Sequence, residues 1–139
     1  MSDRIFVDTN ILLYAHDAGA GSKHDQARKL IEHIWQSGGA IISTQVIQEF
    51  AFNLQRKLKP PMPIDDVRVR VALYAQWTVV LNSSTSVLDA LALQQQHHVS
   101  FWDALILQAA IAAGAEVIYS EDLADGQEYG RVRVVNPLQ

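Results

Sequence analysis

Two kinds of apolar segment alternate along the chain. Short runs rich in β-branched residues cover residues 5–7, 40–42, 78–81, 117–119 and 132–135. Longer stretches with apolar residues at helical spacing lie between them, at residues 10–18, 22–37, 44–58, 64–75, 86–97 and 100–113. Strands that alternate with helices are typical of a parallel sheet covered by helices on both faces. We therefore predict an α/β fold with three layers, α/β/α, around a central, mostly parallel sheet of about five strands.

Two of these segments have a distinct pattern. In the last predicted strand Arg131 and Arg133 alternate with valines, which is typical of an exposed edge strand that charges protect from mispairing. In the last predicted helix, residues 104–113 are apolar on nearly every side. A helix that is apolar all round is buried, so we expect this helix to be central.

Length and composition narrow the class of protein. The 139 residues suit a single domain over residues 1–139, and 49% hydrophobic with 19% charged residues is a globular balance. The net charge of −4 argues against a protein that coats nucleic acid with a basic excess. With no cysteine, disulfides, thiol nucleophiles and cysteine-bound metals are excluded, and a cytoplasmic location is expected. The longest apolar stretch, residues 109–115, is too short for the roughly 20 residues of a membrane span.

Acidic side chains follow several predicted strands. Asp8 comes directly after the first strand, and Glu49 lies in the second turn of the helix after the second strand. Glu121 and Asp122 follow the fourth strand, and Asp125 lies three residues further on. Ligands of open parallel sheets bind beyond the carboxyl ends of the strands, so these acids are expected to face one crevice. Taken singly, Asp8 also suits a cap at a strand end, and Asp125-Gly126 suits a turn.

Asp103 has two interpretations. It lies in the first turn of the predicted buried helix, which feeds the fourth strand and therefore begins at the same carboxyl edge of the sheet. This geometry predicts that Asp103 joins the other acids. The sequence from Ser100 to Asp103 is also an S-x-x-D capping pattern, in which the acid satisfies a free backbone N–H group.

Several carboxylates at one sheet edge raise one another's pKa, and a divalent ion relieves the repulsion. Mg²⁺ or Mn²⁺ prefers oxygen ligands, and an acidic site that holds such an ion suits phosphodiester hydrolysis. Two other classes remain open. A non-catalytic binding module would have no need of converging acids. A phosphoacceptor domain of the receiver type needs a lysine near the end of a late strand, and residues 117–120 contain none.

Four motifs follow one another along the chain: IFVDTNILLYA at residues 5–15, STQVIQEF at 43–50, SFWDALI at 100–106, and YSEDL at 119–123 followed by VVNP at 134–137. In order and spacing, over nearly the whole chain, they resemble the motifs of PIN-domain ribonucleases. The size resembles that of VapC toxins of bacterial toxin–antitoxin pairs.

The resemblance implies metal-dependent cleavage of RNA by Mg²⁺ or Mn²⁺. Asp8 and Asp103 would be the main metal ligands, and Glu49 would bind metal or orient the attacking water. Asp122 is the preferred fourth acid, with Asp125 as the alternative. The resemblance also implies an antitoxin protein that blocks the acidic site, often with a basic side chain, and a homodimer.

Other polar residues have more than one interpretation. Thr9, Asn10 and Ser120 match residues that support the family's site by hydrogen bonds, and each also suits an ordinary turn or cap. Lys57, with its basic neighbours Arg56 and Lys59, suits either phosphate contacts or favourable charge at a helix C-terminus. Trp102 adjoins Asp103 and is the one tryptophan that we would test for substrate contact, although tryptophans more commonly belong to the core.

Overall fold

The computed structural model describes residues 4–138, and a six-stranded sheet lies at its centre in the order β3-β2-β1-β4-β6-β5. β1 pairs in parallel with β2 and β4, β2 with β3, and β4 with β6, whereas β5 pairs antiparallel with β6. The strands are β1 (Ile5–Val7), β2 (Ile41–Ser43), β3 (Thr78–Val80), β4 (Val117–Tyr119), β5 (Glu128–Tyr129) and β6 (Val132–Val135).

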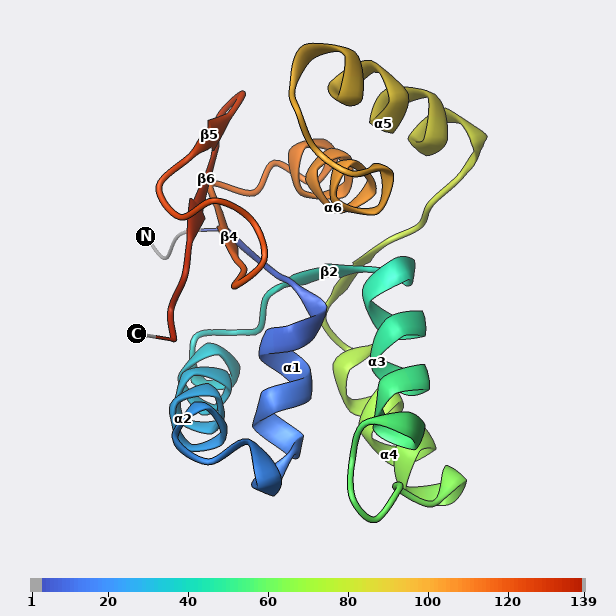
Figure 1. Ribbon diagram of the computed structural model, residues 1–139, viewed down its shortest axis with the longest axis vertical. Coiled ribbons are helices and arrows are strands. Elements are labelled where there is room, and N and C mark those ends of the chain that lie inside the picture. Colours follow the sequence, from blue (N-terminus) through green and yellow to red (C-terminus); the bar gives the residue numbers. More distant parts are fainter. Residues whose placement is uncertain (1–3, 139) are drawn as a thin grey trace.

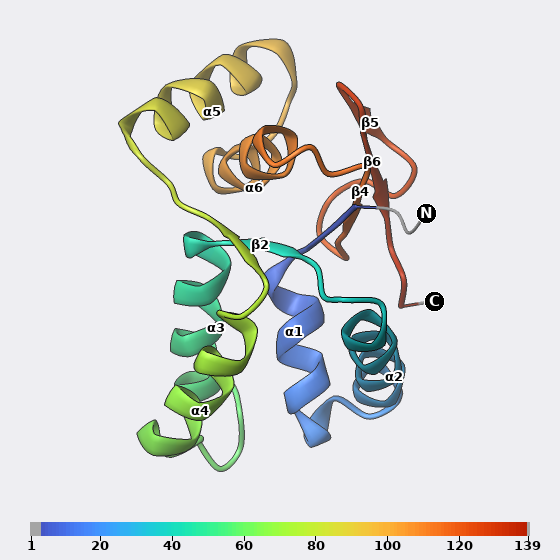
Figure 2. The same ribbon diagram turned by 180° about the vertical axis from the view of Figure 1, so that it is seen from behind.

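Helices cover both faces of this sheet. Figure 1 shows α5 and α6 on one side and α1 to α4 on the other, and Figure 2 shows the same layers from behind. The three-layer α/β/α fold predicted from the sequence is therefore confirmed. The helices are α1 (Thr9–His16), the short 3₁₀ helix η1 (Ala18–Ala20), α2 (Ser22–Gln36), α3 (Thr44–Arg56), α4 (Ile64–Tyr74), α5 (Ser84–Gln96) and α6 (Phe101–Ala112).

Most helices begin where the sequence supplies a cap. The Asp8 side chain accepts from the Thr9 backbone at the start of α1, and the Ser43 side chain accepts from Val46 at the start of α3. α5 begins two residues before the predicted residue 86. The reason is a capping box, in which the Ser83 hydroxyl accepts from the Ser86 backbone N–H and the Ser86 hydroxyl accepts from the Ser83 backbone N–H.

The sheet differs from the prediction at its β5–β6 end. The sixth strand, β5, has two residues and is too short to give an alternating pattern. β6 lies between β4 and β5, so the prediction that it is an edge strand is wrong. Val132 and Val134 are buried and Arg133 is exposed. The alternation of arginine and valine therefore arises because one face of β6 is exposed to solvent, although the strand is paired on both sides.

The core forms where the helices meet the sheet. Phe6 and Ile118 from β1 and β4, Ile11 and Leu12 from α1, and Leu107 from α6 are fully buried. Residues 104–110 of α6 are all buried, which confirms the prediction of a central apolar helix. No helix within residues 4–138 combines the length and hydropathy that a membrane crossing requires.

Candidate active site

A pocket of about 240 Å³ lies where β1 ends and the helices α1, α3 and α6 begin. Four acids that the sequence singled out line it together: Asp8, Glu49, Asp103 and Asp122. They come from four separate parts of the chain, which the parallel strands bring to one edge of the sheet. The rest of the lining consists of Thr9, Asn10, Gln45, Asn53, Lys57, Trp102 and Ile106.

Asp8 is the most buried of the four acids, with 7% of its surface exposed. Its Oδ1 accepts from the backbone N–H of Thr9 at 2.7 Å, and its Oδ2 accepts from the Ser120 hydroxyl at 2.9 Å. Burial raises the pKa of the Asp8 carboxyl to about 6, and the negative charges of Asp122 and Glu49 add to this effect. The two hydrogen bonds act in the opposite direction without cancelling it. Asp8 is thus an anion whose charge is poorly compensated by the protein.

Glu49 lies on α3 and is tied to α1. The Thr9 hydroxyl donates to Glu49 Oε1 at 2.7 Å, so the residue after Asp8 fixes the position of the second acid. Glu49 lies in the second turn of α3, six residues after the Ser43 cap. Thr9 therefore contacts two acids, one through its backbone and one through its side chain.

Asp122 follows β4 and is held from the start of α1. The Asn10 side-chain amide donates to Asp122 Oδ2 at 2.8 Å, and the Ser120 hydroxyl oxygen accepts from the Asp122 backbone N–H at 3.2 Å. Burial raises the pKa of the Asp122 carboxyl, and the charges of Asp103 and Glu121 raise it further. The nearby positive charge of Lys57 and the bond from Asn10 lower it in part.

The structure supports the site interpretation of Asp103 and only half of the capping interpretation, because Ser100 caps α6 without a returning bond from the Asp103 carboxylate. Its backbone N–H donates to the Ser100 hydroxyl at 3.1 Å, so Ser100 is the N-cap of α6 as the sequence pattern predicts. The cap uses the backbone of Asp103, while its side chain lines the pocket. The geometric argument that the start of α6 reaches the carboxyl edge of the sheet is therefore confirmed.

Asp125 and Glu121 do not line this pocket. Asp125 Oδ1 accepts from the backbone N–H of Asn136 at 2.9 Å, which holds the turn before β5 against the end of β6. Glu121 accepts from the Tyr14 hydroxyl at 2.7 Å and forms an ion pair with Lys23 at 2.6 Å. Of the two candidates for the fourth acid, Asp122 is the one that faces the pocket.

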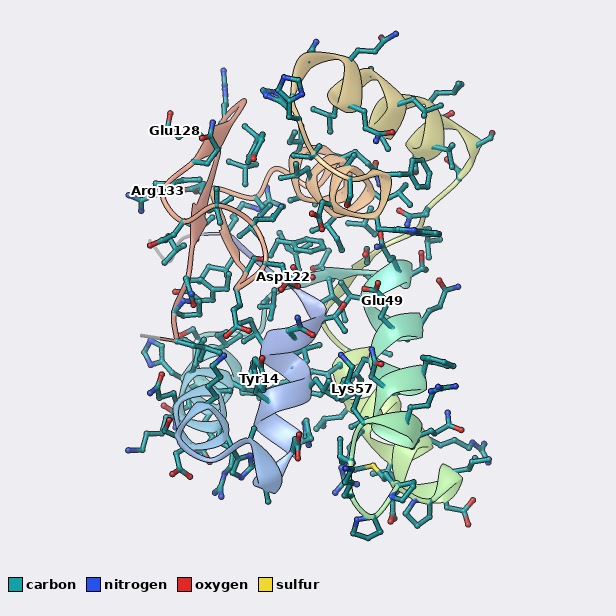
Figure 3. All side chains as sticks on the ribbon, in the orientation of Figure 1. Tyr14, Glu49, Lys57, Asp122, Glu128 and Arg133 are labelled. Carbon is teal, nitrogen blue, oxygen red and sulfur yellow. The ribbon has the colours of Figure 1, made fainter. Side chains whose placement is uncertain are left out.

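A polar stripe on α3 contributes residues that the sequence analysis missed. Gln45, Glu49, Asn53 and Lys57 are spaced four residues apart and all line the pocket. Figure 3 shows Glu49 and Asp122 near the sheet end of α1 and Lys57 further along α3. Residues four apart share one face of a helix, so this spacing was the available signal for Gln45 and Asn53.

The carboxylate oxygens of the four acids are the type of ligand that a hard divalent cation prefers. All four acids offer carboxylate oxygens, which Mg²⁺ and Mn²⁺ prefer, and burial and mutual repulsion keep the pKa of Asp8 and of Asp122 raised. Within the part of the chain that the structure describes, no three acidic or histidine side chains are already spaced around a single ion. Mg²⁺ commonly binds through one or two carboxylates and keeps several waters, so such a preformed group is not required.

The sequence and the structure of the chain were compared with known protein families and solved structures. The family model of the PIN domain matches residues 5–124. The structure is similar to the sarcin–ricin-loop-cleaving toxin VapC20 of Mycobacterium tuberculosis, with a TM-score of 0.65 and 21% identity over 85% of this chain and 89% of that one. It is similar to a chain of a toxin–antitoxin complex from Klebsiella pneumoniae, with a TM-score of 0.67 and 20% identity over 96% and 97% of the two chains.

A third similar structure is VapBC2 from Rickettsia felis, bound to a DNA fragment from its promoter, with a TM-score of 0.60 and 14% identity over 94% and 96% of the two chains. A search of curated proteins finds no match. The solved structures establish the shared fold, and the family model covers most of the chain, including all four acids of the pocket. The chain belongs to the PIN-domain family.

Proposed function

We propose that this protein is a metal-dependent endoribonuclease that hydrolyses RNA phosphodiester bonds, and that it is the toxin of a toxin–antitoxin pair. The observation that carries the proposal is the convergence of four carboxylates, one of them buried with its pKa raised to about 6, on one pocket. Membership of the PIN-domain family and the similarity to toxin structures support the same activity.

In this proposal Asp8, Asp103 and Asp122 hold Mg²⁺ or Mn²⁺, and Glu49 either binds the ion or orients the attacking water. A divalent ion held there would activate a water and stabilise the leaving oxygen of the scissile linkage. The catalytic residues are therefore proposed to be these four acids.

The remaining residues of the pocket have supporting roles. The Thr9 hydroxyl occupies Glu49 Oε1 and leaves Oε2 to accept a proton from water. Ser120 and the Thr9 backbone fix both oxygens of Asp8, which sets the direction of its free lone pairs. Lys57 supplies a positive charge at the far end of the polar stripe, where it suits a phosphate of the bound RNA.

The partners follow from the same site. An antitoxin protein would silence the enzyme by placing a basic side chain among the four acids, since such a side chain gains an ion pair with carboxylates that otherwise repel one another. A homodimer and a cytoplasmic location complete the proposal, as the resemblance of the sequence motifs to VapC toxins implies.

The test is to map new RNA ends after incubating total RNA with the wild-type protein and with an Asp103→Asn variant. We expect cleavage that requires Mg²⁺ or Mn²⁺ and that the variant loses by at least a hundredfold. The matched control is Asp89→Asn, which removes an exposed acid of α5 outside the pocket and should leave cleavage unchanged. Cleavage by Asp103→Asn at the wild-type rate would contradict the proposal.

A calorimetric titration separates this enzyme from a non-catalytic binding module with the same fold. The enzyme should bind Mg²⁺ or Mn²⁺, and Asp8→Asn should weaken that binding. Absence of binding, together with absence of cleavage, would favour the module.

A further inference from the structure

Trp102 is placed unlike the other two tryptophans. Trp77 is buried, and its ring packs against Trp35 at a centroid distance of 5.1 Å and against Tyr74 at 5.0 Å. Trp102 is 63% exposed and lines the pocket that holds the four acids. An indole that is left in water at the rim of a site contributes little to the core and offers a large flat surface to a ligand.

The start of α6 holds this indole on a rigid base. Ser100 caps the helix, and the neighbouring ring of Phe101 contacts Trp102 edge to face at a centroid distance of 5.3 Å. The backbone carbonyl of Trp102 accepts from the Gln45 side-chain Nε2 at 3.2 Å, which ties α6 to α3. An edge-to-face contact with one neighbour leaves a face of the indole open to stacking.

Gln45 supplies a second feature that points to a ligand. Its side chain is 6% exposed and lines the same pocket, yet Oε1 is buried and has no hydrogen-bond donor within residues 4–138. The bond from Nε2 to the Trp102 carbonyl fixes the orientation of the amide, because a carbonyl accepts only from the nitrogen. A buried acceptor without a donor is costly, so this oxygen favours a ligand that brings an N–H or O–H group.

We propose that Trp102 and Gln45 form a subsite for one unpaired nucleotide of the RNA substrate, a proposal that rests on the proposed function. Its base stacks on the indole, and its amino group or 2′-hydroxyl donates to Gln45 Oε1. Aromatic side chains stack unpaired bases regardless of sequence, and the 2′-hydroxyl distinguishes RNA from DNA.

The subsite adjoins the proposed reaction centre. Trp102 and Asp103 are consecutive, so the stacked base belongs to a nucleotide next to the scissile linkage. A base inside a duplex is stacked on both faces and paired along one edge, so it cannot stack on the indole. The subsite therefore accepts an unpaired nucleotide and excludes a paired one.

The first experiment measures binding of a fluorescently labelled 12-nucleotide RNA in EDTA, single-stranded and annealed to its complement. Stacking on an aromatic side chain is worth about 1–3 kcal/mol per base, so Trp102→Ala should weaken binding of the single strand by roughly 5- to 150-fold. Trp102→Phe keeps an aromatic face and should restore part of this affinity. The control Leu88→Ala removes an equally exposed apolar side chain from α5 and should have no effect.

Intrinsic fluorescence gives an independent measurement. Single-stranded RNA should quench the emission of the wild-type protein and should leave that of Trp102→Phe unchanged. Wild-type affinity of Trp102→Ala together with absence of quenching would overturn the subsite.

The Gln45→Met variant, with a side chain of similar length, tests the acceptor. If the 2′-hydroxyl donates, the preference for the RNA strand over a DNA strand of the same sequence should disappear in this variant. If a base amino group donates, a preference among oligonucleotides that differ in their bases should disappear instead. A variant that keeps both preferences at wild-type strength would refute the role of Gln45.

The two proposals fail in different ways. A protein that binds single-stranded RNA through Trp102 and does not cleave it would refute the proposed function and leave the subsite. Cleavage with the wild-type KM and kcat by Trp102→Ala would refute the subsite and leave the proposed function.

Discussion

Replacing Asp8 with asparagine should stabilise the metal-free protein at neutral pH. Burial raises the pKa of this carboxyl from its ordinary value of 3.8 to about 6. A carboxyl with the higher pKa in the folded chain binds its proton more tightly there. Its contribution to the free energy of unfolding is therefore greatest below pH 4 and is lost as the pH rises to about 6. Asparagine keeps the shape of the side chain and removes this titration.

The magnitude follows from the size of the pKa change. At about 1.36 kcal/mol for each pH unit, ionising Asp8 in place costs about 3 kcal/mol at pH 7. Asparagine loses an acceptor for the Ser120 hydroxyl, which already accepts from the Asp122 and Leu123 backbones, and this loss costs about 1 kcal/mol. The net gain is about 2 kcal/mol, or roughly 7 °C in the unfolding midpoint of a domain of this size.

The assay is urea and thermal unfolding in EDTA between pH 4 and pH 8. The difference in unfolding free energy between Asp8→Asn and wild type should grow by about 2 kcal/mol from pH 4 to pH 7, since part of the change already lies below pH 4. The comparison with wild type matters because His16 titrates over an overlapping range with the opposite sign and is present in both proteins. The exposed control Asp89→Asn should follow the wild-type curve.

Adding Mg²⁺ at pH 7 should then stabilise the wild-type protein and leave Asp8→Asn nearly unchanged, because only the wild type keeps the buried carboxylate. A variant that is less stable than wild type at pH 7, with a difference that does not vary with pH, would refute this account of Asp8.

The remaining predictions concern other parts of the molecule. Burial, aided by the charges of Arg70 and His24, lowers the pKa of His16 to about 4, so its contribution to stability should be lost as the pH falls from 6.5 to 4. In urea unfolding, His16→Gln should lose less unfolding free energy than wild type between pH 6.5 and pH 4. The same pH dependence in both proteins would contradict this role of His16. Glu121→Gln should speed hydrogen exchange in the loop after β4 while barely changing global unfolding, because it removes the ion pair with Lys23; unchanged exchange would contradict this role. Leu107→Ala should lower the free energy of unfolding by about 2–5 kcal/mol, since this side chain is fully buried in α6; a loss below 1 kcal/mol in urea unfolding would contradict it.

The sequence by itself determined the positions of the main strands and helices. Every predicted helix boundary lies within two residues of the observed one, because apolar periodicity and caps such as Ser100 are encoded by neighbouring residues. The order of elements also fixed the edge at which Asp8 and Asp103 meet, since parallel strands end on one side of a sheet. The hydrogen bonds of Thr9, Asn10 and Ser120 to the acids agree with their predicted supporting role.

Only the tertiary structure shows which of Asp122 and Asp125 lines the pocket. The loop after β4 turns Asp122 toward Asn10 and leaves Asp125 bound to the Asn136 backbone. The Asp125-Gly126 turn pattern marked a turn in the sequence, but a turn pattern alone does not say which acid faces the pocket. The bond of Glu121 to Tyr14 joins residues 107 positions apart, and β5 is too short to carry a periodic signal. Local periodicity specifies helices and strands because the direction of each side chain follows from its position relative to the neighbouring residues, about 3.6 residues per turn in a helix and two residues per repeat in a strand. Loop geometry and pocket membership depend on contacts between distant segments, which form only when the whole chain packs.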